Sequence, residues 1–583
     1  MPPRSTVSSR SSLSRAPRLR PRRRPRRRSR RRSRWRSRWR LLAALPAAAL
    51  LAGTTLAVPA QAATGSPARP TGGPGGRGLT PGDLLVSGST FTNVPGLVAG
   101  QTVLPPGCTS GCVVATANGT YPQVFNNALV DGSFGVTAPI FLDQLTPWGA
   151  PAGSLTVPDS SGSRGPGRMV TSFSSKSEMA LNLSTDGRSL TFMGYDAPVG
   201  ALDVSNSNTP GVIDPTNPVP GAYYRTVATL GDDGKFTFTN TNAYSGNNGR
   251  AAILNDRAHV IYAAGNAGNG STPQPDGVIL GAGAQLIKPS RAPQVAQHPG
   301  LPTPLGSFSI TQLGDKPDKI GKDDNFRGLT VYRNVVYYTK GSGGNGVNTV
   351  YFVDTTGHAC PSGVGLPAPG AKLPTSPLAY DPATLQTDGL PSNMCILKGF
   401  PTALKSTTSF PFGVWFASPD TLYVADEGSG DNTYSAVSGT YTTAAGQTTA
   451  GLQKWVLSAG SWHLAYTLQA GLSLGTPYTV PGYPTGNNAA TKLPWAPATD
   501  GLRNITGRVN RDGSVTVWAI TSTVSGSGDQ GADPNKLVTI TDRPSAGAPA
   551  AGESFRTVKA AGFGQVLRGV SVTPGTRTGR GDS

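Results

Sequence analysis

The sequence has few of the residues on which most hydrolases rely for acid–base chemistry, and this scarcity limits what it can be. It has only four histidines, and charged residues make up 14% of its 583 residues. No G-x-S-x-G nucleophile motif is present, and "KIGKDD" lacks the serine or threonine of a phosphate-binding loop. Two G-x-G-x-x-G matches, at 73–78 and 341–346, do not open a helix, so dinucleotide binding is not supported.

Acidic residues are absent from the first 40 positions, which contain 18 arginines. Removing these arginines from the formal net charge of +20 leaves +2 for the rest of the chain. The basic charge is therefore a property of the N-terminus alone. A nearly neutral body does not predict a nucleic-acid-binding protein, because such proteins carry their basic charge on the binding domain.

The basic segment is followed by an apolar run, "LLAALPAAALLAGTTLAV", and then by Ala60-Gln61-Ala62. A basic region, an apolar region and an A-x-A site are the three parts of a secretory signal peptide. We expect residues 1–62 to be removed, which leaves a protein without a stable membrane span that is secreted or associated with the cell envelope. An uncleaved membrane anchor is the alternative, and the export route stays open.

Cysteine is scarce as well, with four residues in two pairs. In an exported protein this number predicts two disulfides, Cys108–Cys112 and Cys360–Cys395. The alternative is a metal site that uses His358 and Cys360, although zinc sites usually have two closely spaced ligand pairs.

What the sequence does contain is a repeat. Six segments share an apolar strand, a short turn and a second apolar strand, which is the pattern of a β-hairpin. They begin at Met179, Ala251, Gly328, Gly413 and Asn504, and the sixth is split between Gly569 and Gly82. Further strands follow each pair, so the pattern predicts an all-β propeller of six four-stranded blades, closed by pairing of the terminal strands. A seventh blade within 361–405 and a β-sandwich are the alternatives.

The domain boundaries follow from this repeat. We expect a Pro/Gly linker over 63–80, the propeller over 81–575 and a flexible tail over 576–583. The tail contains Arg580-Gly581-Asp582, which matches the tripeptide recognised by integrins. A tail rich in glycine, arginine and serine also produces this triplet by chance.

Two segments, "LYVADEG" at 422–428 and "RGLTV" at 327–331, resemble blades of secreted six-bladed propellers of the NHL, TolB-like and gluconolactonase-like superfamilies. The resemblance covers most of the chain after residue 80 as a pattern and implies the fold. By this resemblance, Glu178 is similar in position to the metal-ligating glutamate of the gluconolactonase-like propellers. The partner asparagine and aspartate have no counterpart that we can assign, and this leaves the activity undetermined.

One face of the predicted propeller carries long loops after the second strand of each blade. The same face holds the first residue of each innermost strand, because adjacent strands are antiparallel. These residues are Glu178, Arg250, Arg327, Phe412, Arg503 and Arg568. Four arginines at equivalent positions predict a site for an anionic ligand. The alternative is that each arginine caps a neighbouring blade or pairs with a loop aspartate such as Asp431.

The segment "ADEGSGDN" places four oxygen-bearing side chains in one glycine-rich turn: Asp426, Glu427, Asp431 and Asn432. Calcium is the candidate cofactor, because it takes six to eight oxygen ligands. The spacing is not that of an EF-hand, and the alternative is a polar turn held by its own hydrogen bonds.

Two functions follow from these observations. The first is a secreted, non-catalytic module that recognises an extracellular or cell-envelope ligand, which the arginines suggest is anionic. The second is a calcium-assisted hydrolase, of lactonase or phosphoesterase type, with its site at the mouth of the central channel. The first is favoured because no acid–base pair can be singled out, and the sequence predicts no oligomeric state.

Overall fold

The computed structural model describes most residues between 78 and 576, with its longest gaps at 116–134, 161–166, 267–281, 292–302 and 317–322. The signal peptide over 1–62, most of the linker and the Arg-Gly-Asp tail lie outside the described residues. The predictions made for these segments therefore stay predictions.

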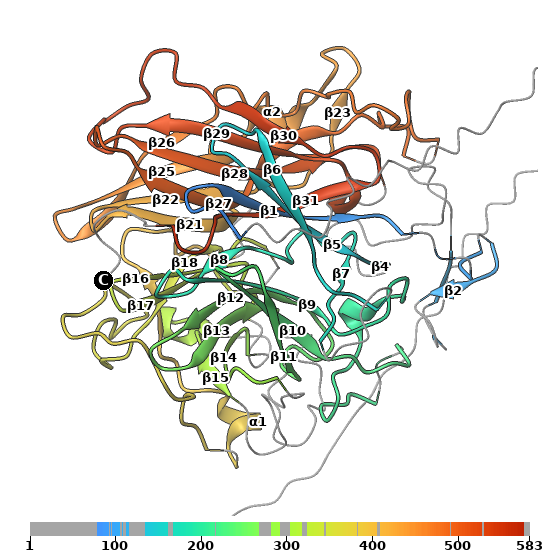
Figure 1. Ribbon diagram of the computed structural model, residues 1–583. Helices are drawn as coiled ribbons and strands as arrows, with labels where there is room; N and C mark the ends of the chain where they lie inside the picture. Colours follow the sequence, from blue (N-terminus) through green and yellow to red (C-terminus); the bar gives the residue numbers. More distant parts are fainter. Residues whose placement is uncertain are drawn as a thin grey trace, which may run out of the picture. The chain divides into compact units, whose positions relative to one another are not determined.

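Six sheets, antiparallel apart from one edge pair in blade 4, contain most of the described strands (Figure 1). We number the sheets as blades in chain order and give their strands from the innermost outward. Blade 1 consists of β31 (Gln565–Val572), β1 (Leu84–Thr90), β5 (Ile140–Leu145) and β6 (Pro151–Thr156). Blade 2 consists of β8 (Asn182–Leu183), β9 (Ser189–Tyr195), β10 (Arg225–Gly231) and β11 (Phe236–Thr241). Blade 3 consists of β12 (Gly249–Asn255), β13 (Val260–Gly265), β14 (Ala284–Ile287) and β15 (Pro304–Gly306).

The second half of the chain forms the other three blades. Blade 4 consists of β16 (Gly328–Tyr332), β17 (Val335–Lys340), β18 (Thr349–Val353), β20 (Met394–Leu397) and β19 (Val364–Gly365). Blade 5 consists of β21 (Pro411–Ser418), β22 (Thr421–Asp426), β25 (Gly451–Ser458) and β26 (Ser461–Leu468). Blade 6 consists of β27 (Ala498–Val509), β28 (Val515–Val524), β29 (Lys536–Asp542) and β30 (Arg556–Ala560).

Small elements decorate the connections between these strands. Three two-stranded ribbons are β2–β3 (Val103–Leu104 and Val113–Val114), β4–β7 (Thr137–Ala138 and Thr171–Ser172) and β23–β24 (Tyr434–Ser435 and Thr440–Tyr441). The α-helices of the described chain are two short ones, α1 (Leu385–Asp388) and α2 (Thr442–Gly446). The all-β class predicted from the repeat is confirmed.

Inner strands are buried on both faces because each blade packs against two neighbours. Every residue of β22 is buried, including the polar Thr421 and Asp426, which explains why its sequence reads as a continuous apolar run. Aromatic rings join adjacent blades, as where Tyr332 of blade 4 stacks on Phe416 of blade 5 with centroids 4.4 Å apart. Blade-to-blade packing of this kind forms the hydrophobic core.

The terminal strands close the ring. The C-terminal β31 is the innermost strand of blade 1, and it pairs antiparallel with the N-terminal β1 through Leu84↔Val572 and Val86↔Val570. Each innermost strand also contacts the next one around the ring, from β8 through β12, β16, β21 and β27 back to β31. This closure leaves no open end at the inner strands and confirms the split repeat predicted from the sequence.

The seventh blade, considered for residues 361–405, is wrong. That region supplies β20 and β19 to the outer edge of blade 4, where β19 pairs parallel to β20. The connection between β18 and β20, residues 354–393, is long enough to return to the same sheet, so its strands extend an existing blade.

Both predicted disulfides are present. Cys360 lies in the 354–393 connection and is bonded to Cys395 of β20, and Cys108 is bonded to Cys112. Disulfides of this kind are compatible with an oxidising compartment outside the cytoplasm. Among the described residues, no helix has the length and apolar character needed to cross a bilayer.

Ring closure predicts that the buried face of β31 contributes strongly to stability. We expect Leu567→Ala to lower the free energy of unfolding by about 2–5 kcal/mol, because Leu567 is fully buried between blades 1 and 6. Leu464→Ala in the outer strand β26 is the matched control, since Leu464 is 42% exposed. Urea denaturation of both variants measures the difference, and equal losses would show that β31 is not part of the core.

Candidate functional site

One face of the propeller gathers the long connections, and we call it the loop face. It is formed by the described parts of the segments that join the second and third strand of each blade, which lie within 91–115, 135–139, 196–224, 282–283, 341–348, 427–450 and 525–535. The inner hairpin turns lie at the opposite ends of the strands and are short, for example 333–334 and 419–420. This asymmetry was predicted. Blades 3, 4 and 6 depart from it, because their third and fourth strands are joined at the opposite face by the connections 288–303, 354–393 and 543–555.

The strand register places the predicted site residues at the loop face. Gly249 of β12 pairs with Gly265, the last residue of β13, and Pro411 of β21 pairs with Asp426, the last residue of β22. All six predicted residues are buried: Glu178, Arg250, Arg327, Phe412, Arg503 and Arg568. Arg250 and Phe412 are the second residues of β12 and β21, and Arg327 directly precedes β16, whereas Arg503 and Arg568 lie inside β27 and β31. A role for these residues in ligand binding stays a prediction.

Two of the arginines connect neighbouring blades. Arg568 of blade 1 donates through Nη2 to the carbonyls of Phe173, which precedes blade 2, and Gly531, which belongs to blade 6, at 2.7 and 2.6 Å. Arg250 of blade 3 donates to the carbonyl of Phe326, which precedes blade 4, at 2.8 Å. These guanidinium groups therefore cap backbone carbonyls of adjacent blades, which is the alternative weighed for them from the sequence.

A buried ion pair joins blades 5 and 6. Arg503 Nε lies 3.1 Å from Glu427 Oε2, and both side chains are about 95% buried. Ser522 of β28 donates to the carbonyl of Glu427 and so fixes the backbone of the same residue. The sequence suggested Asp431 as a loop carboxylate that pairs with an arginine. In the structure, the loop carboxylate that pairs with Arg503 is Glu427.

The other three predicted calcium ligands, Asp426, Asp431 and Asn432, form hydrogen bonds that fix the loop after β22. Asp426 accepts hydrogen bonds from the backbone N–H groups of Phe410 and Gly428, at 2.7 and 3.0 Å. Asp431 accepts from the N–H and hydroxyl of Thr433, and Asn432 donates to the carbonyl of Ser525. These bonds are those of a polar turn, and calcium binding here stays a prediction.

Within the described residues, one group of three metal-ligating side chains lies close enough to hold an ion: Asp354, Cys360 and Cys395. Its two sulfur atoms are joined in a disulfide, so they are not thiolate ligands. Asp354 itself accepts from the backbone N–H groups of Thr356, Gly357 and Ala359. This group is therefore a disulfide beside a polar turn.

Burial changes the acidity of the carboxyl groups at the loop face. It raises the pKa of Asp426 to about 7 and that of Asp500, in β27, to about 6, although hydrogen bonds from backbone N–H groups act in the opposite direction. The negative charge of Glu427 raises both pKa values further. Burial also lowers the pKa of Lys340, at the end of β17, to about 7. Formal charge at this face is therefore smaller than the sequence suggests.

Sequence reasoning missed several residues of this network. Arg225 of β10 is fully buried and donates to the carbonyls of Ser207 and Asn247, at 2.8 and 2.6 Å. It lies in a third strand, so aligning the innermost strands could not reveal it. Asp500 and Lys340 were also missed, although Asp500 lies three residues before Arg503 in the same strand and could have been found there.

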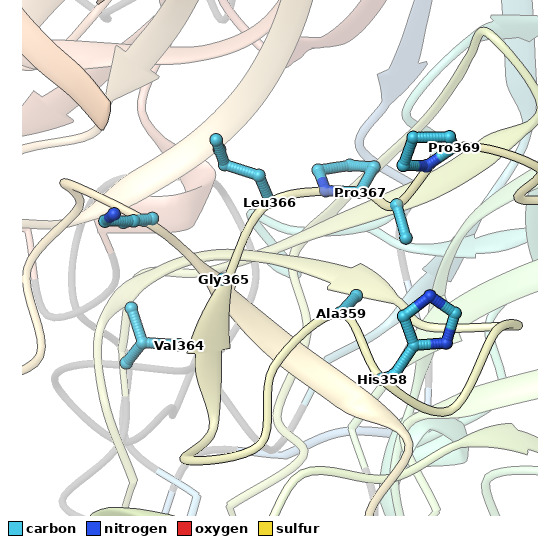
Figure 2. A pocket seen from close by; sticks show the side chains of 9 residues that line it. His358, Ala359, Val364, Gly365, Leu366, Pro367 and Pro369 are labelled. Carbon is cyan, nitrogen blue, oxygen red and sulfur yellow. The ribbon is translucent and has the colours of Figure 1, made fainter. Parts of the chain in front are cut away.

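Away from the loop face, a shallow hollow of about 480 Å³ lies beside β19. Figure 2 shows Leu366, Pro367 and Pro369 along one wall and His358 and Ala359 on the neighbouring loop. The lining combines apolar side chains with the polar side chains of His358 and Lys398. Because it lies away from the loop face, the hollow does not extend the polar network found there.

Comparison with known proteins gives no family. No family model matches the sequence, and no curated protein matches it. Among solved structures, a polysaccharide lyase described as a PL25 ulvan lyase has 12% identity and a TM-score of 0.28, and the match covers 76% of this chain and 93% of the lyase. An acylaminoacyl peptidase has 8% identity and a TM-score of 0.25, over 77% of this chain and 47% of the peptidase. The β-propeller domain of Cps50 (Swd1) from Myceliophteria thermophila has 9% identity and a TM-score of 0.25, over 67% and 96% of the two chains.

The buried ion pair yields a stability prediction. Arg503→Met should lower the free energy of unfolding by about 3–5 kcal/mol, because it leaves the buried carboxylate of Glu427 without its cation. Replacing both residues, as Arg503→Met with Glu427→Leu, should cost less than the two single changes together. A double-mutant cycle by urea denaturation measures this coupling, and strictly additive losses would show that the two charges do not interact.

The raised carboxyl pKa values yield a pH prediction. A carboxyl whose pKa is higher in the folded than in the unfolded protein stabilises the fold at low pH, and this contribution disappears as the pH rises through the folded-state value. Asp426 and Asp500 should therefore make the protein more stable at pH 5 than at pH 7.5. Asp426→Asn should reduce this difference, whatever its effect at a single pH. Melting temperatures across this range measure both, and a melting temperature that rises from pH 5 to 7.5 would contradict the prediction.

Proposed function

We propose that this protein is a non-catalytic recognition module that acts outside the cytoplasm and binds an extracellular or cell-envelope ligand on its loop face. One observation carries the proposal: the charged groups beneath this face make contacts within and between blades. Arg568, Arg250 and the Arg503–Glu427 pair connect neighbouring blades, and Asp426 holds the loop of blade 5. A rigid base under long connections is the arrangement on which binding loops are usually built.

The same observation ranks the two candidate functions. A metal-assisted hydrolase needs carboxylates free to bind the ion and a base free to accept a proton. Each oxygen of Asp426 accepts a backbone hydrogen bond, and Glu427 is paired with Arg503. The calcium-assisted hydrolase therefore stays the second candidate, with no contact in its favour.

The β23–β24 hairpin projects from the loop face and is held in place by hydrogen bonds. Tyr441 anchors it through its hydroxyl, which donates to the carbonyl of Pro494, and through its N–H, which donates to the carbonyl of Gly475. Val437 at the tip is fully exposed. An exposed apolar side chain on an anchored hairpin suits direct contact with a ligand or partner.

A pair of matched valine substitutions tests the proposal. Val437→Asp changes the loop face, whereas Val509→Asp changes an exposed valine at the opposite end of β27. In sedimentation of the protein with purified cell-envelope polymer from the producing cell, we expect Val437→Asp to weaken binding at least threefold and Val509→Asp to leave it unchanged. Equal effects of the two variants, or no sedimentation of the unmodified protein, would contradict recognition through the loop face.

A further inference from the structure

Trp148 lies at the surface on the face opposite the loop face, in the turn between β5 and β6. The turn is at that face because Leu145, the last residue of β5, pairs with Leu84 at the start of β1. Trp148 is 74% exposed, whereas the other described tryptophans are buried or half-buried. Single exposed apolar side chains are common, so the case for a site depends on how this ring is held and on what surrounds it.

The turn that carries Trp148 is held by two blades. Within the turn, Gly149 N donates to the carbonyl of Thr146 at 2.9 Å. Nε1 of the buried Trp518, in blade 6, donates to the carbonyl of Pro147 at 3.2 Å. A Cβ atom on Gly149 would lie 2.8 Å from a side chain of β30, so the turn packs directly on blade 6. The backbone on both sides of Trp148 is therefore fixed before any ligand arrives, which lowers the entropy cost of binding.

Arg556, at the start of β30, supplies a positive charge next to this ring. Its guanidinium carbon lies 5.8 Å from the centroid of Trp148, within the distance over which a cation and an aromatic face attract each other. Arg556 is exposed, and among the described residues it forms no ion pair. Because Trp148 stays 74% exposed, Arg556 covers only part of the ring and leaves room for a second group on it.

A second pair of the same kind lies beside the first. The guanidinium carbon of Arg508, in β27, lies 5.6 Å from the centroid of Trp518, which donates to the residue before Trp148. Arg508 is half-buried and Arg556 is exposed. Two arginines and two tryptophans are thus connected across the junction of blades 6 and 1, and Arg556 is the arginine that a ligand reaches.

The acidic groups near Arg556 already have partners. Asp143 of β5 lies 3.0 Å from Lys559 Nζ and accepts a hydrogen bond from Ser154 Oγ at 2.8 Å. Glu553, three residues before Arg556, accepts from a backbone N–H group of its own connection at 2.9 Å. The surface around Trp148 therefore offers an accessible cation, and its charge complements that of an anionic ligand.

The neighbouring side chains exclude a broad apolar contact. The exposed residues beside the turn are small or polar: Pro151, Ala152, Gly153, Ser154 and Thr557. A stable protein–protein interface buries about 1,200–2,000 Å² and has a hydrophobic centre, which one ring among small residues does not supply. A polysaccharide chain is one sugar unit wide, and the C–H groups of a sugar pack on an aromatic face. The surface at Trp148 has the dimensions and the polarity for such a chain.

We propose that Trp148 and Arg556 bind an acidic polysaccharide, with the indole ring stacked on a sugar unit and the guanidinium group paired with a carboxylate or sulfate group of the same chain. The site lies on the face opposite the loop face, so this inference goes beyond the proposed function and does not rest on it. Single-stranded nucleic acid also combines negative charge with groups that stack on aromatic rings, and the test includes it as the competing ligand.

Quenching of tryptophan fluorescence by acrylamide tests contact with the ring. Polygalacturonate should reduce quenching in the unmodified protein, because a stacked sugar unit shields Trp148 from acrylamide. The same addition should leave quenching of Trp148→Phe unchanged, since the other described tryptophans are buried or half-buried. Equal reduction in the two proteins, or no reduction in either, would overturn the site.

Titration calorimetry with polygalacturonate tests the residues and the charge of the ligand. Trp148→Ala and Arg556→Gln should each weaken binding about tenfold, as expected for a tryptophan or arginine at the centre of a contact. Phe563→Ala and Arg188→Gln are the matched controls, because they change an exposed ring and an exposed arginine elsewhere, and both should bind like the unmodified protein. All four residues are exposed, so melting temperatures should change little.

Matched ligands decide the chemical class. The methyl ester of polygalacturonate has the same sugar units without the charge and should bind about tenfold more weakly, and dextran sulfate should bind more tightly than dextran. Equal affinity for the charged and uncharged members of both pairs would overturn the acidic class. Tighter binding of single-stranded DNA than of either acidic polysaccharide would overturn the assignment to a polysaccharide.

The outcomes separate this site from the proposed function. Val437→Asp, on the loop face, should leave binding of polygalacturonate unchanged. Binding that persists in both Trp148→Ala and Arg556→Gln, or no binding of any acidic polysaccharide, overturns this site and leaves recognition by the loop face intact. Polygalacturonate binding that depends on Trp148, without sedimentation on envelope polymer, supports this site and overturns the proposed function alone.

Discussion

The pairing of β31 with β1 is the constraint on which the rest of the structure depends. It makes the C-terminal strand the innermost strand of blade 1. Blade 1 thereby joins blade 2 to blade 6, which are both built from continuous sequence. The pairing also carries Arg568 to a position where one guanidinium group reaches the carbonyls of Phe173 and Gly531, on the two sides of blade 1. The backbone at Phe173 is thus held by the same strand that closes the ring.

Buried charged side chains connect neighbouring blades through hydrogen bonds and an ion pair. Arg225, Arg250 and Arg568 donate to backbone carbonyls, and Arg503 pairs with Glu427. A buried cation with such partners avoids most of the penalty of losing water, whereas the same cation without them would be strongly destabilising. The raised pKa values of Asp426 and Asp500 further reduce the charge that must be balanced. The buried charged residues connect the blades independently of the long connections above them. We propose that recognition occurs on these long connections of the loop face.

The sequence predicted the fold well because hairpins are local. Turns such as 333–334 and 419–420 follow directly from short polar breaks between apolar strands, and the blade count follows from their number. The alignment of the repeats placed Arg250 at the start of β12 and Arg327 directly before β16, because strand direction determines that position, whereas Arg503 and Arg568 lie inside β27 and β31. Their partners were not predictable: the carbonyl bound by Arg568 lies 395 residues away in Phe173, and a backbone carbonyl carries no sequence signal. A seventh blade within 361–405 stayed open as an alternative, because a short parallel edge strand such as β19 has no periodicity of its own that would assign it to blade 4.

Hydrogen exchange measured with and without purified cell-envelope polymer tests the central claim, recognition by the loop face, most directly. The account predicts slower exchange on binding in residues 427–450, which include the β23–β24 hairpin. The inner hairpin turns at 256–259 and 510–514, on the opposite face, should exchange at unchanged rates. Protection confined to those turns, or to the hollow beside β19, would contradict it.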